Sequence, residues 1–136
     1  MQDNAINWED IKQQATGYLS QYLQIDTTNP PGNETKGAQF LKGILDKEGI
    51  PSEIIESEPG RGNLIARLKG NATKPPLLLL NHIDVVPAEE EKWTYPPVSG
   101  KLVQGEIWGR GALDCKSLGI METIIPASCT HLTLPT

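Results

Sequence analysis

The chain has 136 residues, of which 17 are acidic and 12 basic, and its formal net charge at pH 7 is −5. This length supports one domain with its own core. Because Lys and Arg are not clustered, we expect neither nucleic acid nor an anionic membrane surface as a partner. Residues 1–9 lack the pattern of a signal peptide, and the longest apolar run, Leu77–Leu80, is too short to span a bilayer. We therefore expect a cytoplasmic protein.

Two amphipathic helices are predicted in the first third of the chain. Asn7 can cap the first one, with Asp10 three residues later, and apolar residues then recur at helical spacing. The loop 26–33 ends this helix because it holds two prolines and a glycine. Glu34–Glu48 is the second predicted helix, and Gly49 ends it in a left-handed conformation.

After the second helix the apolar spacing changes to that of a strand. Ser52–Ser57 and Asn63–Lys69 are predicted strands, the second with alternate residues facing inward. The continuous apolar run Pro76–Asn81 suits a central strand that is covered on both faces. Helices, half-buried strands and one buried central strand together predict an α/β layer architecture in a single domain.

The sequence of the last part of the chain predicts a hairpin and a third helix. The segment Gly100–Gly111 has apolar residues on both sides of a central glycine, as in a short β-hairpin. Ser117–Ile125 begins a helix that Pro126 should interrupt. Because residues 126–136 have no periodicity, we expect them to be an aperiodic, non-native tail behind a unit formed by residues 1–125.

Two short motifs carry residues suited to metal chemistry. His82 and Asp84, the first motif, follow the predicted buried strand, at the end where α/β proteins bind their ligands. One ring nitrogen of His82 can bind a metal ion while Asp84 accepts the hydrogen bond of the other nitrogen. A histidine near an aspartate is also a common surface pair, so these two residues alone do not decide between the two interpretations.

The second motif, Gly109–Ser117, places Asp114 in a glycine-rich turn before a helix. Asp114 could be a metal ligand or only the cap of that helix. Lys116 and Ser117 imitate the end of a phosphate-binding loop, but Cys115 occupies the position where that loop needs a glycine. We do not expect Cys115 to be a nucleophile, because no orienting histidine accompanies it in the sequence.

Other conspicuous side chains have structural interpretations. Trp93 is expected to pack the long loop between the two motifs. Arg110 is expected either to tie down that loop or to reach a substrate carboxylate. Trp8, Phe40 and Trp108 are expected in the core or partly buried beside it.

Together the two motifs resemble one known family. Residues 79–88, then Trp93, then residues 107–114 have the order and spacing of the M20 metallopeptidases. That group includes aminoacylases, carboxypeptidases, acetylornithine deacetylase and succinyl-diaminopimelate desuccinylase. The upstream loop 27–34 is similar to the family's early loop, so the resemblance extends over about residues 8–121.

The resemblance implies a partial, truncated mixed-sheet catalytic domain of a zinc-dependent exopeptidase, with a phosphorylase/hydrolase-like fold. His82 would bind one metal ion, Asp84 would orient His82, and Asp114 would bridge two ions. Zinc is the expected metal, two ions per complete catalytic domain, with cobalt or manganese as substitutes. The implied substrate is a small peptide or an N-acyl amino acid, and the implied assembly of the full-length protein is a homodimer. A cis peptide bond is implied between Asp114 and Cys115.

The chain departs from this family after Asp114. Similar enzymes place two adjacent glutamates well beyond the bridging aspartate, one as general base and one as metal ligand. Here Glu122 is the only acidic side chain after Asp114, and His131 lies in the predicted tail. We therefore expect an incomplete centre that binds one metal ion weakly and hydrolyses little. The alternative is a non-catalytic binding or interaction module that retains the catalytic-domain scaffold.

Overall fold

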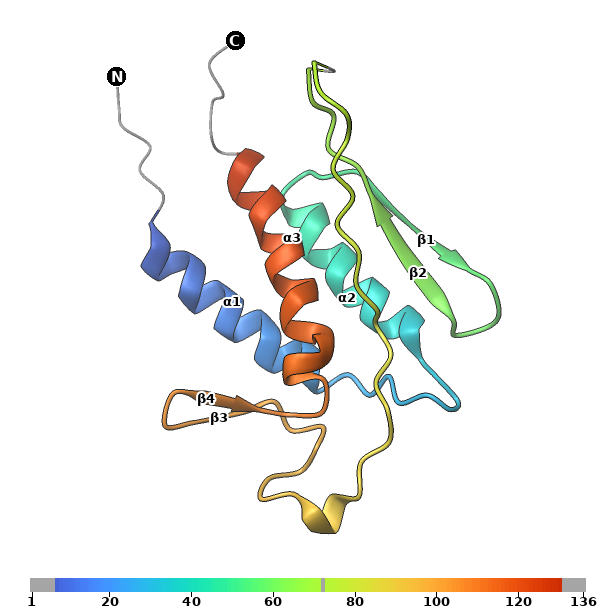
Figure 1. Ribbon diagram of the computed structural model, residues 1–136, viewed down its shortest axis with the longest axis vertical. Helices are drawn as coiled ribbons and strands as arrows, with labels where there is room; N and C mark the ends of the chain where they lie inside the picture. Colours follow the sequence, from blue (N-terminus) through green and yellow to red (C-terminus); the bar gives the residue numbers. More distant parts are fainter. Residues whose placement is uncertain (1–6, 72, 131–136) are drawn as a thin grey trace.

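A computed structural model of the chain describes residues 7–71 and 73–130. Three helices lie side by side, with α3 contacting both of the others (Figure 1). The helices are α1 (Trp8–Leu23), α2 (Glu34–Lys47) and α3 (Ser117–Thr130). The strands are β1 (Ser52–Glu56), β2 (Gly62–Ala66), β3 (Lys101–Val103) and β4 (Glu106–Trp108), and two short turns of helix are η1 (Glu90–Lys92) and η2 (Ala112–Lys116). Helices and strands occur together along the chain, as the sequence predicts.

The ends of the first two helices follow from the residues that the sequence places there. The Asn7 side chain accepts hydrogen bonds from the backbone N–H groups of Glu9 and Asp10, at 3.2 and 3.4 Å, and so caps α1. Gly49 follows α2 with φ 67°, the left-handed conformation that favours glycine at this position. Both predicted helix ends are confirmed.

The main core forms where the three helices meet. Its buried residues are Tyr22, Leu41, Ile44, Ile120 and Ile124. The ring of Tyr22 on α1 stacks on Phe40 of α2, with 5.4 Å between ring centroids. Because every helix contributes to this cluster, the helices hold one another in place and form the base on which the loops rest.

Two antiparallel hairpins flank the helices. Strands β1 and β2 pair with Ser52 opposite Ala66, and this hairpin packs on α2. Strands β3 and β4 form the hairpin predicted within Gly100–Gly111. Its turn residues Gln104 and Gly105 have φ of 52° and 85°, and positive φ at both central positions is the requirement of a type I′ turn.

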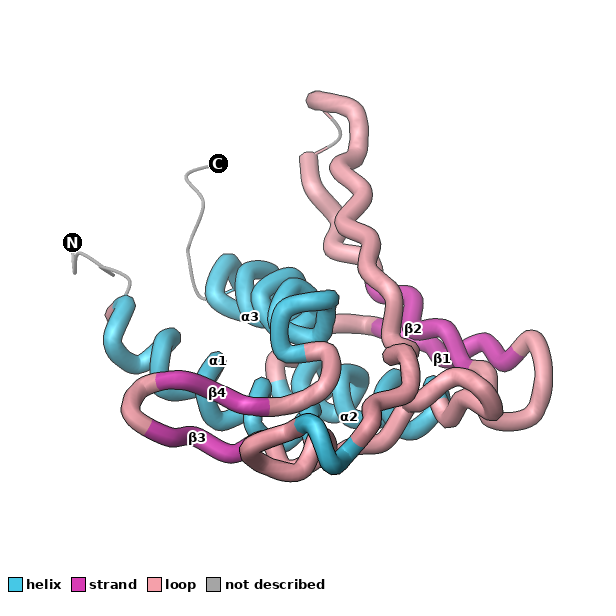
Figure 2. The backbone as a smooth tube through the Cα atoms, turned by 60° about the horizontal axis from the view of Figure 1, so that its bottom comes forward, coloured by secondary structure: helices cyan, strands magenta, loops and turns pink. Residues whose placement is uncertain are grey.

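The apolar run Leu77–Leu80 does not form the buried central strand that its sequence predicts. Its side chains are 85%, 79%, 45% and 77% exposed, in chain order. Figure 2 shows the loop that follows β2 standing out from the helices. An extended segment becomes a buried strand only when other strands pair with it and other layers cover it. Among the described residues the only parallel pairing is a single bridge between Thr28 and Val85, so these residues form no mixed sheet.

Two smaller predictions are also wrong. Helix α3 continues through Pro126 to Thr130, so this proline does not end the helix. Trp8 is 71% exposed, since Ile11, one turn later, is the first residue of α1 that packs against the core. In the part of the chain that the structure describes, no helix is long and apolar enough to cross a membrane.

Two glycines of α2 provide a test of this packing. A Cβ at Gly37 would lie 2.6 Å from Cγ2 of Ile83, whereas a Cβ at Gly43 would meet nothing within 4 Å. We expect Gly37→Ala to lower the free energy of unfolding by about 1–3 kcal/mol through overpacking. Gly43→Ala should raise it by about 0.5–1 kcal/mol, because alanine favours the helix. Urea unfolding followed by circular dichroism measures both, and equal stabilisation by the two variants would contradict the close approach of Ile83 to α2.

Candidate metal centre

The segment 81–86 is held against the early loop of the chain by backbone pairing. The N–H of Val85 donates to the carbonyl of Thr27 at 3.1 Å, and the carbonyl of Val85 accepts from the N–H of Asn29 at 2.9 Å. The buried hydroxyl of Thr27 donates to the carbonyl of Ile83 at 2.8 Å. These bonds fix the backbone on both sides of position 84.

A glycine lets the second motif approach that segment. Gly111 has φ 88°, and a Cβ there would lie only 2.7 Å from Cγ1 of Val85. The turn η2 follows, with non-helical backbone angles at Asp114 and Cys115. The peptide bond between these two residues is cis, as the resemblance predicts. Only glycine permits both the positive φ and the close contact at position 111.

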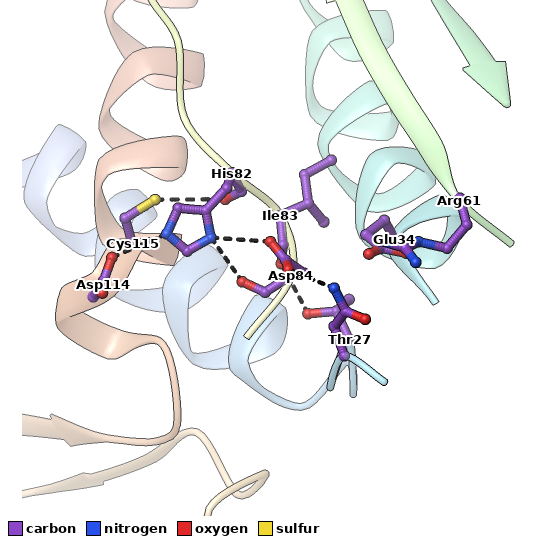
Figure 3. A network of polar contacts seen from close by, with 9 residues as sticks. Thr27, Glu34, Arg61, His82, Ile83, Asp84, Asp114 and Cys115 are labelled. Carbon is purple, nitrogen blue, oxygen red and sulfur yellow. Dashed lines mark hydrogen bonds and ion pairs between the residues drawn. The ribbon is translucent and has the colours of Figure 1, made fainter. Parts of the chain in front are cut away.

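The two motifs meet at the ring of His82. Its Nε2 lies 3.0 Å from Oδ1 of Asp114. Its Nδ1 lies 2.8 Å from the carbonyl oxygen of Asp84 and 3.2 Å from Oδ1 of the same residue. Figure 3 shows Asp84 and Asp114 on different sides of the imidazole. The three residues singled out in the sequence are therefore brought together, and each ring nitrogen faces a different aspartate.

The polar and charged groups around His82 shift the pKa values of both His82 and Asp84. The pKa of His82 is raised, mainly by its hydrogen bond with Asp114 and further by the contacts with Asp84, while partial burial acts in the opposite direction. The pKa of Asp84 is lowered, chiefly because the side-chain amide of Asn29 donates to its Oδ2 at 3.0 Å, and His82 adds to this effect. Asp84 is thus held in the charged form that can accept a hydrogen bond from the imidazole.

The donors of this group suit a divalent cation. Imidazole nitrogen and carboxylate oxygen are both common zinc ligands. Nδ1 of His82 is already in contact with oxygens of Asp84. The other ring nitrogen, Nε2, faces Asp114 and could bind an ion beside it. The side chain of Asp114 is 91% exposed, so its oxygens are accessible to an incoming ion.

An open cavity of about 800 Å³ adjoins these donors. His82, Asp84 and Asp114 line it together with the apolar side chains of Trp93, Ile107 and Trp108. A cavity that combines apolar surface with a few convergent polar groups is the usual form of a small-molecule site.

Comparison with known proteins is consistent with this geometry. The family model described as peptidase family M20/M25/M40 matches residues 78–124, which contain both motifs. A probable succinyl-diaminopimelate desuccinylase of Staphylococcus aureus is 37% identical over 108 residues, which cover 79% of this chain and 26% of that protein. Aminoacylase-1 of Sus scrofa is 35% identical over 102 residues, or 74% of this chain and 25% of that protein. The chain belongs to the M20 peptidase family. It spans about a quarter of the length of the curated relatives it matches.

Arg110 ties down a loop in this M20 chain. Its guanidinium lies 5.2 Å from the centroid of the Trp93 ring, and its Nη2 donates to the carbonyl of Pro87 at 3.4 Å. The backbone N–H of Arg110 also donates to the carbonyl of Pro97 at 2.7 Å. These contacts support the structural interpretation of Arg110, and they place Trp93 against the loop that it was expected to pack.

Lys116 is a structural residue and not part of a phosphate site. Its ammonium donates to the carbonyls of Tyr22 at 3.1 Å and Ile25 at 2.7 Å, beside the C-terminal end of α1. The residue is 1% exposed, so a phosphate group has no access to it, and burial lowers its pKa to about 8.

Burial also raises the pKa of the Cys115 thiol, which disfavours the thiolate that a nucleophile needs.

One residue of the site, Asn29, was not singled out in the sequence. Asn29, which holds Asp84, lies in the early loop similar to that of the family, and this loop was the only signal for it. Glu122 does not join the group, since it accepts a hydrogen bond from the side chain of Asn81 at 2.5 Å. His131 lies outside the described residues.

Removing the Asn29 amide tests how Asp84 is held. We expect Asn29→Ala to raise the pKa of Asp84 toward its ordinary value, measured from carboxyl ¹³C shifts against pH. A carboxyl whose pKa is lower in the folded state stabilises the fold at pH values above its unfolded pKa of about 3.9. This stabilisation is lost as the pH falls through the folded pKa. Below about pH 4 the stability of the variant should therefore fall less steeply than that of the parent. An unchanged Asp84 titration would show that the amide does not hold the carboxylate.

Proposed function

We propose that this chain carries part of the metal centre of an enzyme that hydrolyses amide or peptide bonds. His82 would hold one divalent ion through Nε2, and Asp114 would share its carboxylate between that ion and a second one. Asp84 would be a positioning residue that fixes the ring of His82. The observation that carries the proposal is the 3.0 Å approach of His82 to Asp114, 32 positions along the chain, beside an open cavity. Bound divalent ions would supply the Lewis acidity that amide hydrolysis needs.

Small peptides or N-acyl amino acids are the proposed substrates. Two of the relatives, a probable succinyl-diaminopimelate desuccinylase and aminoacylase-1, support this class. The apolar side chains of Trp93, Ile107 and Trp108 line the cavity beside His82 and would contact an acyl group or an apolar side chain. Zinc is the proposed metal, and cobalt or manganese would suit the same nitrogen and oxygen donors.

Residues 1–136 alone would form an incomplete centre. A catalytic zinc ion takes about three protein ligands, and a two-metal site needs ligands for both ions. The described residues gather His82, Asp114 and Cys115, whose donor atoms lie within 4.8 Å of one another, and this set is too small for two ions. We propose that the general base and the remaining ligands belong to other parts of a longer protein. A cytoplasmic location and a homodimer of that protein remain predictions.

The alternative of a non-catalytic interaction module has less support. A module that folds alone is expected to bury its large apolar side chains, whereas Leu77–Leu80 leave three of their four side chains more than three-quarters exposed. The centre at His82 also has no role in that alternative. The two cases differ in solution, because a self-sufficient module should be monodisperse and melt cooperatively without metal.

Zinc titration by calorimetry tests the proposal. We expect residues 1–136 to bind one zinc ion weakly, and His82→Ala to weaken this binding by at least about tenfold, since even groups that only support a ligand have effects of that size. His131→Ala, at the second of the chain's two histidines, is the matched control and should leave zinc affinity unchanged.

Two outcomes would contradict this account. Equal loss of affinity in the two histidine variants would remove His82 as the specific ligand. Appreciable hydrolysis of an N-acyl amino acid by residues 1–136, abolished by His82→Ala, would show that the centre is complete without further ligands.

A further inference from the structure

A buried ion pair lies behind the early loop, on the side away from His82. Glu34, the first residue of α2, is 7% exposed, and its Oε2 lies 2.8 Å from Nε of Arg61. Arg61 ends the turn that joins β1 to β2. In the view of Figure 3, Ile83 and Thr27 lie between this pair and the ring of His82. A carboxylate is costly to bury unless a partner compensates its charge, so the pair ties the hairpin turn to the start of α2.

The same hairpin turn is docked closely on α2. The N–H of Thr35 donates to the carbonyl of Gly60 at 3.0 Å, and the hydroxyl of Thr35 donates to Oε1 of Glu56. A Cβ at Gly62 would lie 2.6 Å from Oγ1 of Thr35 and 3.0 Å from its Cα. Several contacts besides the ion pair therefore hold the turn in place, and Arg61 extends toward α2 from a fixed support.

Gly32 connects the ion pair to the loop that carries Asn29. The residue has φ 86°, and a Cβ there would lie 2.6 Å from Oε2 of Glu34 and 2.9 Å from Nε of Arg61. Its N–H donates to the carbonyl of Thr28 at 2.8 Å, which closes a turn with Asn29 inside it. Only glycine permits both the positive φ and the close contact with the charged pair. A change at the pair therefore acts on the backbone beside Asn29.

We propose that Glu34 and Arg61 are positioning residues of the metal centre, which act through the early loop. They hold the turn of Gly32 in the place from which the amide of Asn29 reaches Oδ2 of Asp84, at 3.0 Å. Neither residue is a proposed metal ligand. The inference rests on the function proposed above for its effect on metal binding, whereas its effect on the loop needs no metal ion.

A pair that only stabilised the fold would have a different effect on hydrogen exchange. Local opening accelerates exchange in one segment, whereas a loss of global stability also accelerates the most protected amides of the core. The N–H of Val85 donates to Thr27 and that of Asn29 donates to Val85, so both report the contact of the early loop with the His82 segment. The N–H of Ile44, a buried core residue, reports the fold as a whole.

Hydrogen exchange of the full chain, followed by NMR, tests the proposal together with zinc titration. In Glu34→Gln we expect the N–H groups of Asn29 and Val85 to exchange at least about tenfold faster than in the parent, while that of Ile44 changes less. Zinc affinity should also fall, but less than in His82→Ala, because the ligand itself is retained.

Two further variants complete the design. Asp46→Asn is the matched control, since it removes a carboxylate from an exposed ion pair on the same helix, with 2.7 Å between Lys42 and Asp46, and it should change neither measurement. Arg61→Lys keeps the positive charge on a side chain that is 36% exposed, but lysine lacks the planar guanidinium. We expect the same pattern as in Glu34→Gln with a smaller amplitude, and this variant decides the question if Glu34→Gln does not fold.

The outcomes separate this inference from the function on which it rests. Equal acceleration of all three amides, or of none, would overturn the positioning role. A loosened loop with unchanged zinc affinity would overturn it as well. Failure of the parent chain to bind zinc would overturn the proposed metal centre, and exchange at Asn29 and Val85 would still decide whether the pair holds the loop.

Discussion

Backbone pairing between the early loop and the segment that carries His82 is the constraint on which the rest of the site depends. The bonds of Thr27 and Asn29 to residues 83–85 hold that segment to the end of α1, which is itself fixed in the helical core. Without this pairing, His82 would lie on a loop with no fixed relation to Asp114. The same early loop supplies the amide that holds Asp84, so one element sets both the position and the charge of the centre.

The polar centre of this chain is held in position by its contacts, whereas part of the chain's apolar surface is left uncovered. The centre has its positioning contacts in place, and the buried ammonium of Lys116 joins the start of α3 to the end of α1. By contrast, Leu77–Leu80 lie extended and largely exposed just before His82. Local loops can be fixed by a few hydrogen bonds, whereas a central strand needs partner strands and covering layers that the described residues do not provide.

Features that depend on local chemistry could be predicted from the sequence, whereas features that depend on covering layers or on distant contacts could not. The cap at Asn7, the helix end at Gly49 and the hairpin turn at Gly105 depend on local chemistry, and all three were predicted. The exposure of Leu77–Leu80 could not be predicted, because an apolar run indicates burial only if the covering layers are present. The convergence of the two motifs was implied by the family's order and spacing. The role of Lys116 depends on a contact between residues more than ninety positions apart, and no local pattern indicates it.

The ¹⁵N resonances of the His82 ring during zinc addition test the central claim most directly. The account predicts that Nε2 shifts to a metal-bound value while Nδ1 keeps its proton and its hydrogen bond to Asp84. A ring that does not respond to zinc, or that binds it through Nδ1, would contradict the assignment of His82 as the ligand that faces Asp114.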